Sequence, residues 1–212
     1  MKATDILKNE HRVIEQVLNC LEKIADRSLA EGELDCRSAM QAVEFLQHFA
    51  DHCHHGKEEG HLFPLLEARG FSRQNGPTGV MLLEHQEGRH HIQTMKAAIA
   101  QAATGVPQAL ERFTSHAQAY IRLLRVHIFK EDRCLFPMAN EVLSDQDQRS
   151  LEESFDDVET CEMGRGTHEK YLQLADELAD RFDVLHAAAA ATATTGCLHH
   201  LVSSLRERQL PC

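Results

Sequence analysis

One motif occurs twice in this chain and constrains its fold more than any other feature. The stretches HHGKEEGHLFP at residues 54–64 and HIFKEDRCLFP at residues 127–137 share the pattern H-x-x-K-E-x-x-x-L-F-P. Residues four positions apart lie on one face of a helix, one turn from each other. His54 with Glu58, and His127 with Glu131, can therefore each address one centre from a separate helix.

The first copy of the motif lies in a stretch with more ligand-type residues than the repeat explains. HCHHGKEEGHLFP also contains four such residues for which the second copy has no matching pair: His52, His55, Glu59 and His61. The repeat selects His54 and Glu58 and gives these four lower priority. We interpret His55, Glu59 and the motif lysines Lys57 and Lys130 either as groups that orient ligands or as a solvated charged face.

Helical periodicity dominates the chain up to about residue 143. Apolar residues at steps of three and four predict helices over residues 4–29, from about 35 to beyond 60, over a stripe from Met81 to Ile99, and from Pro107 through Glu131. The loop GFSRQNGPTG at residues 70–79 separates the second helix from the third. Four amphipathic helices with short connections predict an all-α fold, an up-down-up-down four-helix bundle.

The first and third predicted helices each place one histidine on an apolar stripe. His11 falls between Leu7 and Ile14, and His85 falls between Met81 and Ile92. A lone inward histidine is usually a core residue with a hydrogen-bond partner. Several unpartnered histidines and two carboxylates in one core would be very costly, and a shared metal removes that cost. The predicted ligands are His11, His54, Glu58, His85, His127 and Glu131.

The composition of this ligand set indicates the metal. Six ligands exceed the four of a tetrahedral zinc site. Two carboxylates can bridge two ions and leave two histidines for each. Mixed imidazole and carboxylate ligation suits iron or manganese and excludes a soft thiolate centre. A dinuclear non-haem iron site, with manganese as the less favoured metal, fits best and leaves positions open for dioxygen, nitric oxide or peroxide.

A ferritin-like di-iron site is the rival interpretation, because such sites use E-x-x-H pairs on two helices. Glu58 with His61 and Glu87 with His90 have this spacing. Glu87 and His90 lie opposite His85 on a helix that turns about 100 degrees per residue, so they should face solvent if His85 faces inward.

Charge and composition bear on partners and location. The net charge of -11 argues against nucleic acid or an anionic membrane as a partner. No apolar run is long enough to span a bilayer, and the N-terminal MKATDILKNEHR lacks the apolar core of a signal peptide. Seven cysteines without CxxC pairing fit reduced thiols. These features together predict a cytoplasmic protein.

The pattern changes in the last third of the chain. SDQDQRSLEESFDDVE is acidic, MGRGTHEKYLQLADELADRF predicts a fifth helix, and LHAAAAATATTGC is of low complexity. We therefore divide the chain into a bundle at residues 1–145 and a C-terminal helical appendage at 146–212.

Over roughly residues 4–143 the chain resembles the hemerythrin-like, HHE-type cation-binding proteins. The resemblance rests on NEHRVI at His11, CHHGKEEGHLFPLLE at His54 and Glu58, LLEHQEGR at His85, and HIFKEDRCLFP. It implies a four-helix bundle with an oxo- or hydroxo-bridged di-iron centre. Members of the family carry or sense oxygen, handle nitric oxide, or help to repair iron–sulfur centres.

The chain departs from the oxygen-carrying members at two positions. Arg89 stands where they have a second histidine on the third helix, and Glu131 stands where they have an aspartate. The four-His, two-Glu set looks more like bacterial repair and sensor members, although the short cysteine-bearing N-terminal domain of typical repair proteins is missing. A less crowded centre is expected to leave the iron open to added ligands.

Two classes of function follow. In the first, the protein binds or senses a small ligand (dioxygen, nitric oxide or peroxide) or handles iron. In the second, it is a di-iron enzyme that reduces one of these ligands or aids iron–sulfur repair. The sequence shows no flavin or nucleotide-binding motif, so an enzyme would take its electrons from a separate donor protein; this favours the first class.

Overall fold

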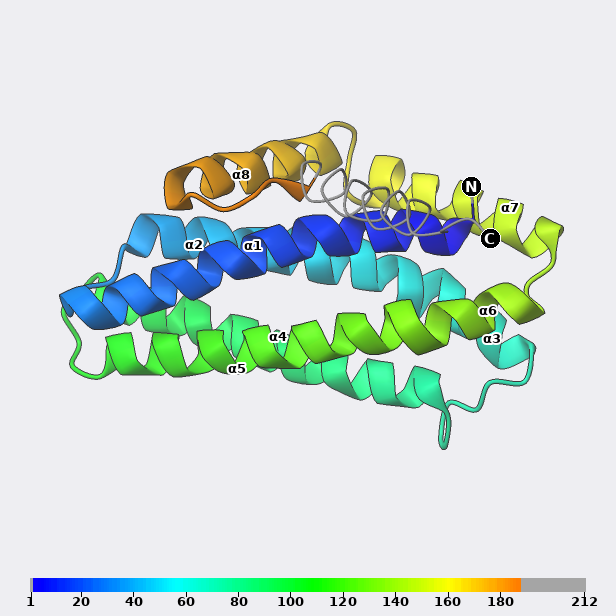
Figure 1. Ribbon diagram of the computed structural model, residues 1–212, viewed down its shortest axis with the longest axis horizontal. Coiled ribbons are helices and arrows are strands. Elements are labelled where there is room, and N and C mark those ends of the chain that lie inside the picture. Colours follow the sequence, from blue (N-terminus) through cyan, green and yellow to red (C-terminus); the bar gives the residue numbers. More distant parts are fainter. Residues whose placement is uncertain (1, 188–212) are drawn as a thin grey trace, which may run out of the picture.

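The structure is a computed structural model that describes residues 2–187, and every secondary-structure element in that range is helical. Long helical segments run side by side along the long axis of the molecule (Figure 1). The predicted all-α class is therefore confirmed. The end of the predicted appendage, with most of its low-complexity stretch, lies outside the described residues.

Four long segments form the body of the molecule. The first is α1 (Ala3–Glu31), and the third is α4 (Pro77–Ala102). The second consists of α2 (Cys36–Phe45), η1 (Leu46–His55), η2 (Glu58–Leu62) and α3 (Phe63–Ala68). The fourth consists of α5 (Ala109–Lys130), η3 (Glu131–Leu135) and α6 (Phe136–Val142). Helix α5 packs against α1 and α4, and α2 packs against the same two helices.

The fourth segment begins two residues later than Pro107, the predicted start. Gln108 has φ 66°, a left-handed conformation that lies outside the helical region, so the helix begins at Ala109. At the same end of the molecule Gly32, with φ 72°, terminates α1 and donates its amide to the Ser28 carbonyl at 2.9 Å.

Both copies of the motif contain a turn of π-helix. The amide of Phe63 donates to the carbonyl of Glu58, and the amide of Phe136 donates to that of Glu131, so each bond spans five residues. The prolines of the two L-F-P sequences explain the wide turns. Pro64 and Pro137 have no amide hydrogen, and each ring displaces the carbonyl four residues earlier.

The core has two parts, with the motif between them. The Leu-Phe pairs of the two motifs are buried in the smaller part, together with Leu7 and Met81. Ile14 and Ile92 belong to the larger part. Because His11 lies between Leu7 and Ile14, and His85 between Met81 and Ile92, the predicted ligands form a polar layer between the two parts.

The C-terminal helices α7 (Asp145–Asp157), η4 (Val158–Glu162) and α8 (Thr167–Phe182) complete the described chain. The acidic stretch to which we assigned no helix forms α7, because Ser144 caps its amino end and Leu151 and Phe155 are buried. Leu178 and Phe182 of α8, the predicted fifth helix, join the larger core. The division at residue 145 stays a prediction, but α7 and α8 contribute to both parts of the core.

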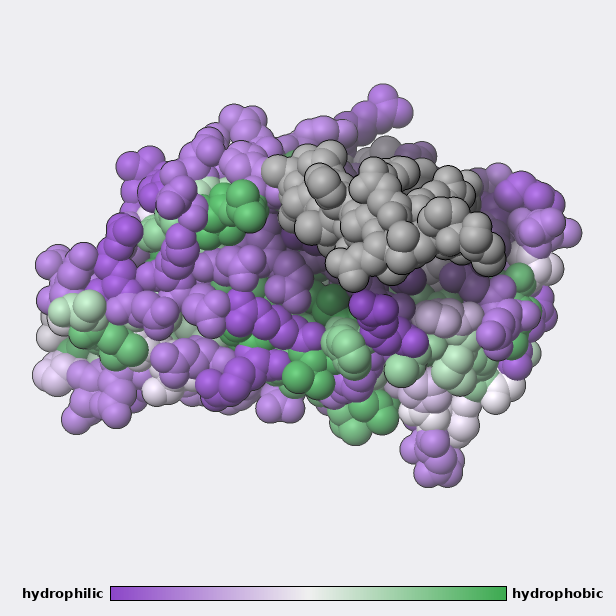
Figure 2. Space-filling model, in the orientation of Figure 1, coloured by the Kyte–Doolittle hydropathy of each residue, from purple (hydrophilic) through white to green (hydrophobic). Residues whose placement is uncertain are grey.

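The face of the molecule in Figure 2 is mostly hydrophilic, with scattered apolar side chains. No helix of the described chain combines the length and the apolar character that a membrane crossing requires.

Candidate metal centre

The structure brings all six predicted ligands together inside the polar layer. Each of these side chains is at most 2 % exposed: His11, His54, Glu58, His85, His127 and Glu131. It also places His55, which is 3 % exposed, in the same layer. Five imidazoles and two carboxylates therefore face one another from α1, the second segment, α4 and the fourth segment.

These seven side chains form two overlapping groups, in each of which the ligand atoms lie within 4.8 Å of one another. The first group is His11, His54, Glu58 and Glu131, and the second is His55, Glu58, His85 and His127.

The two glutamates connect the groups. Glu58 belongs to both, with Oε1 3.8 Å from His54 Nε2 and Oε2 3.5 Å from His85 Nε2. Glu131 Oε2 lies 3.2 Å from His11 Nε2 and 3.3 Å from His127 Nε2. Each glutamate thus lies close to one imidazole from each group, so both carboxylates could be shared by two ions.

Each imidazole is oriented from behind by a carboxylate. The pairs, with the distance from Nδ1 to the carboxylate oxygen, are His11 with Asp132 at 2.9 Å, His54 with Glu10 at 2.8 Å, His55 with Asp51 at 3.4 Å, His85 with Glu59 at 2.7 Å, and His127 with Glu84 at 2.9 Å. An ionised carboxylate only accepts hydrogen bonds, so each Nδ1 donates. The Nε2 lone pair of a neutral imidazole is then directed into the centre, the tautomer that a metal ligand requires.

Several atoms of the centre are buried without a hydrogen bond. Within residues 2–187, Nε2 of His11 and His54 and all four carboxylate oxygens of Glu58 and Glu131 accept no hydrogen bond. A buried unsatisfied polar group costs about 1–3 kcal/mol, and more when it is charged. Metal ions would satisfy these atoms. The donor set is nitrogen and oxygen without sulfur, which fits iron or manganese.

The electrostatics of the two glutamates differ. Burial raises the pKa of Glu58 well above its usual value, and the adjacent Glu131 carboxylate adds to this. Burial also opposes ionisation of Glu131, but His127 and His11 outweigh it and hold the pKa of Glu131 well below its usual value. For His127, burial favours the neutral form, and the charges of Glu131 and Glu84 overcome it and raise the pKa to about 9.

Sequence reasoning gave His55 low priority, and the structure explains why. The second motif has Ile128 at the matching position, so the repeat carries no signal for His55. In the π-helical segment η1 each turn holds more residues than in an α-helix, which brings adjacent side chains closer in direction. His55 stacks on His85 with ring centroids 3.7 Å apart. The adjacent histidine pair was the available signal.

Arg89, at the position of a second histidine in oxygen carriers, supports two of the orienting carboxylates. Its Nε donates to Asp51 at 2.8 Å and its Nη2 donates to Glu59 at 2.7 Å. Asp51 and Glu59 in turn face His55 and His85. With His55 present, the centre contains five imidazoles rather than the four expected.

The E-x-x-H pairs of the ferritin-like alternative do not meet at this centre. Glu87 is 61 % exposed and His90 is also exposed, as expected from their position opposite His85. His61 belongs to neither ligand group. The ferritin-like ligand arrangement is therefore absent from the described residues.

A third group of candidate ligands lies beside the centre and consists of Glu10, Glu159 and His168. The Lys57 Nζ atom donates to Glu10 Oε1 and, at 2.5 Å, to Glu159 Oε1. The ammonium group already provides the positive charge between these carboxylates, so we assign no metal there.

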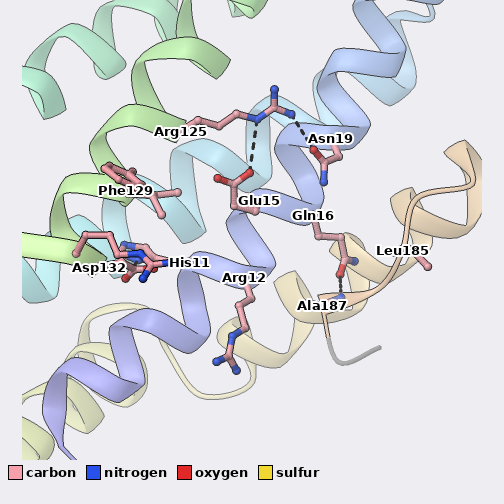
Figure 3. A pocket seen from close by; sticks show the side chains of 12 residues that line it. His11, Arg12, Glu15, Gln16, Asn19, Arg125, Phe129, Asp132, Leu185 and Ala187 are labelled. Carbon is pink, nitrogen blue, oxygen red and sulfur yellow. Dashed lines mark hydrogen bonds and ion pairs between the residues drawn. The ribbon is translucent and has the colours of Figure 1, made fainter. Parts of the chain in front are cut away.

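A groove reaches the edge of the centre from the surface between α1 and α5 (Figure 3). It has a volume of about 520 Å³, and His11 and Asp132 form part of its wall. Arg12, Phe129 and Leu185 line it nearer the surface. A molecule of a few atoms in this groove would be close to the outer edge of the His11 ring.

Comparisons with known proteins agree with the geometry. Residues 2–139 match the hemerythrin family, described as the hemerythrin HHE cation-binding domain. An uncharacterized protein of Mycobacterium tuberculosis, Rv1995, and one of Mycobacterium bovis, Mb2018, are each 27% identical to this chain over 178 residues. Each alignment covers 84% of this chain and 68% of the relative. No solved structure matches the chain significantly.

Proposed function

Because the chain belongs to the hemerythrin HHE cation-binding family, we propose that its two ligand groups hold a pair of iron ions, with manganese as the second choice. The observation that carries the proposal is the sharing of Glu58 and Glu131 between two sets of inward-directed imidazoles. The proposal includes the up-down four-helix arrangement of the long segments.

The ligand groups suggest an unequal division of the imidazoles. His11 and His54 would hold one ion, and His55, His85 and His127 the other, with both glutamates shared. When bound, the metal pair supplies Lewis acidity and electrons. The chain itself orients the imidazoles through their carboxylate partners and excludes water with apolar cores on either side.

We infer that the centre binds or senses dioxygen, nitric oxide or peroxide, or handles iron, in the cytoplasm. The groove beside His11 supports a small ligand, since it leads from solvent to the edge of the buried layer. The alternative is an enzyme that reduces such a ligand with electrons from a donor protein, or that aids iron–sulfur repair.

Metal analysis and visible absorption of the purified protein test this proposal. We expect about two irons per chain and a visible spectrum that changes with dioxygen or nitric oxide. His54→Ala and Glu131→Ala should lose iron, because each removes a ligand atom of the centre. His116→Ala is the matched control: its Nδ1 lies 2.9 Å from that of His91, outside both ligand groups. Stoichiometric zinc, or no metal, would contradict the proposal.

Stopped-flow reoxidation of the reduced protein separates the two classes. A stable adduct with the ligand identifies a carrier or sensor. Rapid turnover to peroxide or water, sustained by an added electron donor, identifies an enzyme.

A further inference from the structure

The repeated motif contains a lysine that the proposed ligand set leaves unexplained. In H-x-x-K-E, Lys57 and Lys130 each precede the motif glutamate and follow the motif histidine by three residues. A histidine and a lysine at this spacing lie on neighbouring positions of a helix surface. Both can therefore reach one group on a facing helix.

In both copies that group is a glutamate of another helix. Glu10 of α1 accepts from His54 Nδ1 on Oε2, at 2.8 Å, and from Lys57 Nζ on Oε1. Glu84 of α4 accepts from His127 Nδ1 on Oε2, at 2.9 Å, and from Lys130 Nζ on Oε1. The atom-by-atom pattern is the same, although the two glutamates come from different helices.

We propose that Lys57 and Lys130 are positioning residues that hold Glu10 and Glu84 in the orientation at which each fixes its metal-binding histidine. A carboxylate behind a histidine ligand fixes its ring orientation and tautomer and makes it a better ligand. A carboxylate held at only one oxygen can rotate away from the ring. The ammonium group on the second oxygen prevents this rotation and balances the carboxylate charge, which is buried at Glu10 and partly buried at Glu84. This inference rests on the proposed metal centre.

The two lysines differ in their surroundings, which predicts unequal effects. The Lys57 side chain is fully buried, and Glu159 of η4 provides a second carboxylate partner. The Lys130 side chain is 32 % exposed, so water can partly replace its ammonium group. Loss of Lys57 should therefore weaken metal binding more than loss of Lys130.

Titration of the metal-free protein with Co²⁺, in competition with a chelator, tests the inference. We expect Lys57→Met to bind Co²⁺ about 10- to 100-fold more weakly than wild type, the range found when groups behind metal ligands are removed. Lys130→Met should lose less Co²⁺ affinity than Lys57→Met. The visible Co²⁺ bands should also shift in Lys57→Met, because a reoriented His54 changes the ligand field. Lys96→Met is the matched control, since the hydrogen bond of Lys96 in the described structure goes to Gln47 and not to a carboxylate behind an imidazole.

A double-mutant cycle separates positioning from a general loss of stability. If Lys57 acts through Glu10, Lys57→Met/Glu10→Gln will bind Co²⁺ no more weakly than Glu10→Gln alone. Additive losses, or wild-type affinity and spectrum in both lysine variants, overturn the inference. Should Lys57→Met fail to fold, the same cycle with Lys130→Met and Glu84→Gln decides it. If wild type itself binds no Co²⁺, the proposed metal centre fails as well; if wild type binds and the variants match it, only the positioning role fails.

Discussion

Asp147 shows how single side chains attach the C-terminal helices to the rest of the molecule. Its two carboxylate oxygens each accept from Arg69 Nη2 at 2.8 Å, and the backbone amide of Ser144 donates to Oδ2 at 2.9 Å. The Arg69 pair, and then the Ser144 amide, lower the pKa of Asp147 from 3.8 to about 2. The carboxylate thus joins the loop after α3 to the first turn of α7.

This shift predicts how stability depends on pH. Because the pKa is lower in the folded than in the unfolded state, the contribution of Asp147 is complete above the unfolded value and is lost as the pH falls toward 2. We expect the melting temperature of wild type to exceed that of Asp147→Asn from neutral pH down to about pH 5. The difference between the two melting temperatures should narrow below about pH 4. Thermal unfolding of both metal-free proteins measures it. A gap that stays constant to pH 3 would show that the Arg69 pair is not the cause.

Also at the scale of residues, some side chains of the centre could be predicted from the sequence and others could not. His54, Glu58, His127 and Glu131 could be predicted because the motif repeats at a fixed helical spacing. Of the carboxylates behind the imidazoles, Glu59 was among the sequence candidates, but Glu10 and Glu84 could not be predicted because they meet their histidines only after the helices pack. His55 was missed because its contribution depends on the π-helical geometry of one segment.

At the scale of elements, the sequence predicted the four long segments well because their apolar periodicity is strong. It missed the π-helical turns η2 and η3 of the two motifs. The L-F-P prolines that explain these two turns were visible, but a proline inside a helix can also end it. It also missed α7, in which charged residues surround Leu151 and Phe155 and obscure the apolar stripe.

The loop before α4 leads to a prediction for that helix. A Cβ atom on Gly79, in the first turn, would lie 1.9 Å from the carbonyl oxygen of Arg73. Because this neighbour is backbone, Gly79→Ala must displace the loop and should destabilise the protein by about 1–3 kcal/mol, as overpacking does. Gly56→Ala is the opposite case: its Cβ would meet nothing within 4 Å. It should stabilise by about 0.5–1 kcal/mol through helix propensity. Urea unfolding of both variants measures the change in the free energy of unfolding. A change of the same sign in both variants would contradict this account.

At the scale of the whole molecule, the C-terminal helices contact the groups behind His54 from α8, whose His168 Nε2 lies 3.8 Å from Glu10 Oε1, and from η4. Glu159 of η4 accepts from Lys57, which in turn bonds to Glu10 behind His54. We expect Glu159→Gln to weaken Co²⁺ binding by about 2- to 5-fold, the size of one partly exposed ion pair. This is less than the loss in Lys57→Met, since Glu10 still holds the lysine. Glu153→Gln, on the exposed side of α7, is the control. Equal Co²⁺ affinities in wild type, Glu159→Gln and Glu153→Gln would show that η4 does not influence the centre.

The sequence could not predict this connection, because Lys57 and Glu159 lie far apart in the chain and neither belongs to a local pattern. Composition marked residues 146–212 as different from the bundle. It did not indicate that α7 and α8 would enter both parts of the core, since that depends on which faces the first four segments leave uncovered.

The series of side-chain contacts that leads from His54 through Glu10 and Lys57 to Glu159 has a thermodynamic consequence. If docking of η4 strengthens metal binding by a given factor, then metal binding strengthens the docking of η4 by the same factor, because the two equilibria share one cycle. The C-terminal helices would then report the state of the centre to whatever contacts them. A buried lysine in a helical motif would serve as the link between metal chemistry and the outer surface of the protein.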